Sequence, residues 1–158
     1  MDCTFKTDEG KFNFRVGAII RDKNRVLMAK NPSETRDFLY SVGGRVHFGE
    51  TLEEAVLREV KEETGLEAEI ERLFAIHENF FCEHGVPYHE ISIFFLIKTS
   101  AELKSIKNGT PTDNVKTGEY LEWVDLNDCA SKTLYPDFYK TVDFETKKDV
   151  LHFITRDM

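Results

Sequence analysis

Residues 44–66 read GRVHFGETLEEAVLREVKEETGL, and the fold prediction starts from this stretch. A helix is predicted to begin at about Leu52. Thr51 followed three residues later by Glu54 forms the capping-box pattern, in which both side chains accept hydrogen bonds from free backbone N–H groups. Gly65 can adopt the left-handed conformation that ends a helix. The stretch therefore predicts a loop, a helix of about three and a half turns, and a second loop.

The predicted helix carries three glutamates on one side. Four apolar residues define its buried stripe: Ala55, Val56, Leu57 and Val60. At 100° of rotation per residue, Glu59 and Glu63 fall inside this stripe and Glu62 falls beside it. A charged run is usually a solvated helix face, but sheltered carboxylates need a positive partner. Arg58 is predicted to project toward the far side and to compensate them only in part. Magnesium prefers oxygen ligands and substrate phosphates, so the pattern indicates a metal platform for a phosphate group.

Apolar and β-branched runs on both sides of the helix predict strands. These runs are residues 12–20, 25–30, 38–44, part of 67–81, 88–99 and 119–126. The run 88–99 is apolar on both faces near its middle, which predicts a central strand. Segments 125–131 and 136–141 are each predicted as a short helix, whereas VLHFIT near the end fits a strand or a helix. This order of elements predicts an α/β or α+β domain with a mixed sheet and helices against it.

The chain length and composition predict one soluble domain, residues 1–158. The 29 acidic and 21 basic residues give a formal charge of -8, which argues against a nucleic acid polymer or an anionic membrane as partner. No window reaches the roughly 18 apolar residues of a membrane span, and the first residues lack the apolar run of a signal peptide. Three widely spaced cysteines fit a reducing compartment, so a cytoplasmic location is expected.

The spacing of the defined residues in 44–66 resembles a complete Nudix box. These residues are Gly44, Glu50, Arg58, Glu59, Val60, Glu62, Glu63, Gly65 and Leu66. The resemblance implies a Nudix-type α/β/α sandwich around a mixed sheet. It also implies hydrolysis of a nucleoside diphosphate linked to another group X, with water attacking phosphorus and Mg²⁺ at the diphosphate, for which Mn²⁺ is the alternative. One departure is Val42, since many members have proline before the glycine pair.

The resemblance also implies roles for individual residues. Glu59 and Glu63 resemble the principal metal ligands, and Glu62 a third or water-bridged ligand. Arg58 resembles the residue that pairs with and orients a glutamate of the box. The implied catalytic residues are Arg58, Glu59, Glu62 and Glu63. The implied metal site comprises Gly44, Glu59, Glu62, Glu63 and Glu119. The glycine would contribute its carbonyl oxygen, and the carbonyl of Gly43 is the alternative.

The general base and the role of Glu50 stay open at this stage. Glu59 and Glu63 are the candidates for the base within the box. Glu119 is the candidate outside it because it follows a long polar loop, and a structural role is its alternative. Glu50 would support the loop or coordinate a further ion.

A nucleotide substrate should also contact residues outside the box. The candidates are Arg15, Arg36, Tyr40 and Asn79, each with a surface or core role as its alternative. The expected partner is a small nucleotide, and the protein itself is expected to be a monomer or a homodimer. A Nudix domain that binds a nucleotide metabolite as a sensor is the competing hypothesis. Sensors usually have an incomplete box or an added effector domain, so the complete box favours the enzyme.

Overall fold

The computed structural model describes residues 1–145 and 149–158, and within them the strands form one mixed sheet. The strands are β1 (Thr4–Lys6), β2 (Lys11–Ile19), β3 (Arg21–Asp22), β4 (Arg25–Lys30), β5 (Phe38–Arg45), β6 (Glu69–Glu83), β7 (Val86–Lys98), β8 (Thr110–Pro111), β9 (Tyr120–Asp125), β10 (Thr133–Tyr135) and β11 (Leu151–Asp157). Their order across the sheet is β11-β6-β7-β2-β5-β4-β9-β8. Strand β1 pairs with β2, β10 with β5 and β3 with β4. The predicted mixed sheet is confirmed, and 88–99 falls largely in the internal strand β7.

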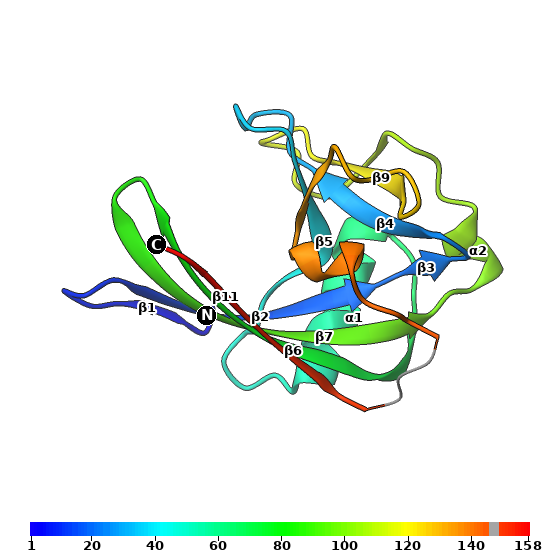
Figure 1. Cartoon of the computed structure of the whole chain (residues 1–158). Helices are drawn as coiled ribbons and strands as arrows, with labels where there is room; N and C mark the ends of the chain where they lie inside the picture. The colour runs from blue at the N-terminus through cyan, green and yellow to red at the C-terminus, as the bar shows by residue number, and fades with distance from the viewer. Residues whose placement is uncertain (146–148) are drawn as a thin grey trace.

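The core lies on both faces of this sheet because the strand residues alternate between them. On one face, Val16 and Ala18 of β2 pack in a cluster that includes Val56 of helix α1 (Leu52–Thr64). On the opposite face, Ile19 of β2 and Phe94 of β7 belong to a second cluster, which residues of the segment 126–144 complete. In Figure 1, α1 lies behind the sheet, and the 3-10 helix η1 (Asp137–Lys140) lies in front of it. The mixed sheet between helical segments gives an α+β fold.

Helix α1 has the ends that its sequence predicts. The Thr51 hydroxyl accepts the Glu54 N–H at 3.1 Å, and the Glu54 carboxylate accepts the Thr51 N–H at 2.8 Å. At the other end, Gly65 has a φ of 77° and donates its N–H to the carbonyl of Lys61 at 2.8 Å. Both caps satisfy backbone groups that a helix end leaves free. The helix therefore fixes Glu59 and Glu63 over the sheet.

The helix predicted at 125–131 is wrong. Asp125 accepts the N–H of Asn127 with its own carboxylate at 2.9 Å, and this local bond favours a turn over a helix. The chain then forms strand β10, which pairs in parallel with β5. The helix predicted at 136–141 is reduced to η1, and VLHFIT belongs to strand β11 rather than to a helix. The expected long polar loop contains the short helix α2 (Ala101–Lys104) and strand β8.

One end of the sheet extends away from the rest of the molecule. Figure 1 shows strand β1, the tip of the β6–β7 hairpin and the end of β11 together in this extension, with both termini close to it.

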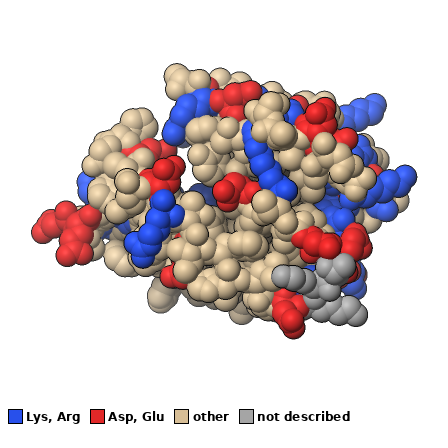
Figure 2. All heavy atoms as spheres, viewed as in Figure 1, with Lys and Arg blue, Asp and Glu red and all other residues tan. Residues whose placement is uncertain are grey.

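On the face in Figure 2, acidic and basic side chains are interspersed. Among the described residues, no helix has the length and apolar character needed to span a membrane.

Candidate active site

The site is built where strand β5 passes beneath helix α1. Gly44 of β5 lies directly against the Glu59 carboxylate, since a Cβ atom at Gly44 would stand 2.3 Å from Glu59 Oε1. Any side chain at Gly44 would displace this carboxylate. Glu59 is only 9% exposed. Burial raises the pKa of Glu59, and the neighbouring Arg58 guanidinium opposes this shift.

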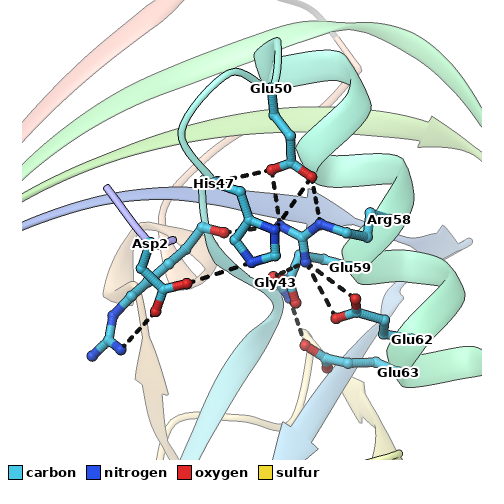
Figure 3. A network of polar contacts seen from close by, with 9 residues as sticks. Asp2, Gly43, His47, Glu50, Arg58, Glu59, Glu62 and Glu63 are labelled. Carbon is cyan, nitrogen blue, oxygen red and sulfur yellow. Dashed lines mark hydrogen bonds and ion pairs between the residues drawn. The ribbon is translucent and has the colours of Figure 1, made fainter. Parts of the chain in front are cut away.

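The Arg58 guanidinium is the centre of the polar network in Figure 3. It donates to Glu50 at 2.6 and 3.1 Å, to Glu59 at 2.7 Å and to Glu62 at 3.2 Å. It also donates to the carbonyl of Arg45 at 2.9 Å. The prediction that Arg58 points away from these carboxylates is therefore wrong: a helical wheel places its Cα, whereas its long side chain reaches back around the helix. The bond to Arg58 lowers the pKa of Glu50 to about 2.

Glu63 is the most isolated carboxylate of the helix. It is 8% exposed, and its Oε1 accepts the N–H of Gly43 at 3.0 Å. Its other oxygen, Oε2, is buried and has no hydrogen-bond partner among the described residues. Burial raises the pKa of Glu63 well above its usual range; the Gly43 N–H opposes the shift, and nearby Glu119 and Glu59 add to it. Glu63 therefore lacks the positive partner that a sheltered carboxylate requires.

The other two predicted carboxylates are less sheltered. The side chain of Glu62 is 40% exposed, and its contact with Arg58 is the long one of the network. Glu119 precedes strand β9 and accepts the Thr112 hydroxyl at 2.9 Å. Burial raises the pKa of Glu119, partly opposed by the bond from Thr112. Glu119 thus lies within electrostatic reach of Glu63 while coming from a different element.

A surface pocket of about 310 Å³ lies over this network. Its lining residues are Asp2, Arg15, Gly44, Arg45, His47, Arg58, Glu59 and Glu62. Of the residues predicted to bind substrate, Arg15 is therefore beside the box carboxylates, where burial raises the pKa of Glu59, Glu63 and Glu119 and the charge of Arg15 opposes this rise in small part. The pocket therefore combines carboxylates that are hydrogen-bonded to Arg58 with basic side chains at its rim.

The other three predicted substrate residues lie elsewhere in the described chain. Arg36 stacks over the Phe38 ring, with 4.4 Å between the guanidinium carbon and the ring centroid. Tyr40 donates its hydroxyl to Glu34 at 2.9 Å. Asn79 lies in β6, paired between β7 and β11. None of the three is among the residues that line the pocket.

Two pocket residues were missed by the sequence reasoning. Asp2 accepts from Arg45 at 3.1 Å and lies 3.4 Å from the His47 Nε2. Arg45 directly follows the glycine pair, so its place within the stretch 44–66 was a usable signal. Asp2 offered none, because its contact depends on the first residues pairing with the loop after β5.

The donor set fits a hard divalent cation better than any other group. Carboxylate oxygens are the ligands that Mg²⁺ and Mn²⁺ prefer. The buried, unpartnered Glu63 Oε2 is the observation that points to one. Among the described residues, no three His, Cys, Asp or Glu side chains already converge on one point. Arg58 explains this arrangement in part, because it draws Glu59 and Glu62 toward its own guanidinium.

The fold and the site together define an α+β domain that presents helix carboxylates beside a glycine pair. The sequence model of the NUDIX domain matches residues 11–143. The chain therefore belongs to the Nudix family.

Curated relatives and solved structures agree with this assignment. The ADP-ribose pyrophosphatase of Methanocaldococcus jannaschii is 34% identical over 117 residues, covering 73% of this chain and 64% of that protein. The putative nudix hydrolase 1 of Caenorhabditis elegans is 37% identical over 149 residues, 89% of this chain but 37% of that protein. The chain thus spans less than two thirds of either relative. The crystal structure of a MutT protein from Bacillus halodurans has a TM-score of 0.64 at 19% identity, covering 91% of this chain and 90% of the other.

Proposed function

We propose that this protein is a Mg²⁺-dependent hydrolase that cleaves a diphosphate bond in a nucleotide, with Mn²⁺ able to replace Mg²⁺. The substrate is a nucleoside diphosphate linked to a further group. Cleavage occurs by attack of water on phosphorus. Membership of the Nudix family and the similarity to an ADP-ribose pyrophosphatase support this proposal. The free cysteines Cys3, Cys82 and Cys129 favour a reducing, cytoplasmic location.

The state of Glu63 carries the proposal. A carboxylate with 8% exposure and one unpartnered buried oxygen is costly to keep ionised. A bound divalent cation would remove this cost, and its remaining positions would accept phosphate oxygens. The formal charge of -8 makes the same cation necessary for an anionic substrate to approach.

Each residue of the site has a defined part in this proposal. Glu59 and Glu63 hold the cation, with Glu62 and a carbonyl at Gly44 completing the donors. When bound, the cation supplies charge neutralisation at the phosphoryl oxygens and a lower pKa for a coordinated water. Arg58 positions Glu59 through their 2.7 Å bond.

Two further residues act from outside the helix. Arg15 binds a phosphate at the pocket rim, which its 36% exposed side chain can reach. Glu119 either binds the cation or accepts a proton from the attacking water. Its raised pKa makes the carboxylate a stronger base than an ordinary glutamate.

The test is hydrolysis of a panel of dinucleotides, nucleotide sugars and nucleoside triphosphates with Mg²⁺. Wild type is compared with Glu63→Gln and Glu119→Gln, and with Glu71→Gln, an exposed glutamate of β6, as the matched control. We expect turnover by wild type and the control, and a loss of at least about 100-fold in Glu63→Gln, typical of a lost metal or proton-transfer group. A lower rate in Glu119→Gln that no longer falls on the acid side of the pH–rate profile, at unchanged Mg²⁺ affinity, would identify the base.

Two results would count against the enzyme. Equal turnover by Glu63→Gln and wild type would remove the proposed metal site. Tight binding of a nucleotide without turnover on any substrate would favour the sensor function instead.

A further inference from the structure

A cluster of three aromatic rings lies on the same strand as the glycine pair. Phe38 and Tyr40 come from β5, and Tyr135 comes from β10, which pairs with this part of β5. The ring centroids of Tyr40 and Tyr135 lie 5.6 Å apart at an interplanar angle of 20°, and Phe38 meets Tyr135 edge-on at 4.9 Å. All three side chains are partly exposed. Aromatic rings that keep an accessible surface are natural stacking partners for a nucleobase.

The cluster lies on the face of the sheet that carries the active site. Side chains alternate along β5, so Tyr40 shares its face with Val42 and Gly44. Val42 packs in the cluster beneath α1, and Gly44 touches Glu59. Tyr40 and Gly44 lie four positions apart along the strand, a distance of about 13 Å. This span suits a nucleoside whose diphosphate reaches the helix carboxylates.

Glu34 places a carboxylate at the edge of the cluster. The Tyr40 hydroxyl donates to its two oxygens at 2.9 and 3.2 Å. Because a phenol oxygen lies in the plane of its ring, the carboxylate lies at the ring edge. A carboxylate accepts about four hydrogen bonds, so capacity remains for a ligand.

The loop that carries Glu34 is held in place by its own contacts. Asn31 accepts the Ser33 N–H with its side chain at 2.9 Å, and the Ser33 hydroxyl donates to the Thr117 carbonyl at 2.8 Å. These bonds tie the loop to the segment that leads into Glu119. Glu34 also lies within electrostatic reach of Glu119, which links the aromatic cluster to the active site.

We infer that the nearly parallel rings of Tyr40 and Tyr135 form the stacking surface for the base of the substrate, with Phe38 packed edge-on against them, and that Glu34 selects a base with a guanine-type edge. Guanine presents two adjacent donors, N1–H and the 2-amino group, which match the two oxygens of a carboxylate. Adenine places its N1 lone pair in the same position, where it would face a negative oxygen. This inference rests on the proposed function, because it names the base that the nucleotide substrate carries.

The test is equilibrium binding in Mg²⁺ of nucleoside triphosphate analogues with a non-hydrolysable methylene bridge. The guanine, adenine and hypoxanthine forms are compared, because hypoxanthine lacks only the 2-amino group. Wild type should bind the guanine form about tenfold more tightly than the adenine form, with hypoxanthine between them. Glu34→Gln should reduce this preference to less than about threefold, whereas Glu9→Gln, at an exposed turn between β1 and β2, should leave it unchanged.

The stacking surface is tested separately from the base edge. Tyr135→Ala should weaken all three analogues by about tenfold while sparing inorganic tripolyphosphate, which has no base. Tyr135→Phe keeps the ring and should bind like wild type, and unchanged tripolyphosphate binding by Tyr135→Ala controls for a folding defect in that variant. A guanine preference that survives Glu34→Gln, or a wild type that prefers adenine, would overturn the inference. Because binding needs no turnover, a base preference here together with no hydrolysis in the substrate panel would count against the proposed hydrolase and not against the assignment of the base site.

Discussion

Replacing Arg58 with alanine should destabilise the protein in a way that added Mg²⁺ partly reverses. The substitution removes every bond of the guanidinium to Glu50, Glu59 and Glu62. Glu59, which is 9% exposed in the wild type, then loses its bonded counter-charge and keeps only the weaker effect of Arg15 among the described residues. In the metal-free protein, the free energy of unfolding should fall, because a sheltered carboxylate has lost its counter-charge.

The magnitude follows from the exposure of the partners. The side chains of Arg58, Glu59 and Glu50 are 22%, 12% and 19% exposed, and that of Glu62 is 40% exposed. Breaking a fully buried pair costs about 3–5 kcal/mol, whereas exposed pairs contribute about 0.2–1 kcal/mol. This half-sheltered network lies between these limits. We therefore expect a loss of about 2–3 kcal/mol at pH 7.

The assay is urea unfolding with and without Mg²⁺. Trp123 is the single tryptophan and is 9% exposed, so its fluorescence reports on loss of the core. Arg58→Lys keeps the charge without the planar fork and should lose an intermediate amount. Lys98→Ala removes an exposed pair with Glu69 and should change stability by less than about 0.5 kcal/mol.

The effect of Mg²⁺ on the stability difference between Arg58→Ala and wild type separates a loss of counter-charge from a loss of side-chain packing. The alanine variant has a more negative site, so saturating Mg²⁺ should narrow its difference from wild type. Ligand binding at about 100 times Kd stabilises a protein by about 2.7 kcal/mol, and a tighter Kd gives more at the same ligand concentration, so the two proteins must be compared at equal Mg²⁺ concentration. An Arg58→Ala protein as stable as wild type without metal, or a difference that widens with Mg²⁺, would refute the argument.

Three other predictions test the cap of helix α1, the loop before it and the glycine of β5 that lies against Glu59. Thr51→Ala removes the cap of α1 and should lower the unfolding free energy by about 1 kcal/mol in urea titrations. The pKa of Glu50 is lowered to about 2, so its contribution to stability is complete above about pH 4.5 and is lost as the pH falls toward 2. After discounting for solvent, acid titration of wild type against Glu50→Gln should show a difference of about 1–2 kcal/mol that disappears over this range. Gly44→Ala places a Cβ against the Glu59 carboxylate and should reduce turnover by about tenfold, or ~1.4 kcal/mol of barrier, in steady-state assays.

Local sequence signals predicted the elements whose causes are local. The capping box and Gly65 defined both ends of α1, because each cap is formed by residues within one turn of it. Alternating apolar residues located the long strands for the same reason. Strand β10 has no such signal: its three residues are strand because they pair with β5, about 95 positions earlier in the chain.

The site shows the same division between local and distant causes. The wheel correctly placed Glu59 and Glu63 on the sheltered side, since helix geometry fixes where a Cβ points. It placed Arg58 wrongly because the end of a long side chain is set by its partners. Glu50 attracts that guanidinium from the loop before the helix, which no periodicity within the helix can reveal.

Arg58 therefore has two opposed effects on the same carboxylates. Without metal, its single positive charge is shared among Glu50, Glu59 and Glu62, while Glu63 has no ion pair in the described network. A cation that binds Glu63 must then compete with Arg58 for Glu59. The free energy by which the guanidinium stabilises the metal-free site makes the free energy of cation binding less favourable by a corresponding amount. A chain that keeps both groups could fold without the proposed cation and would still have the Glu63 carboxylate available to bind it.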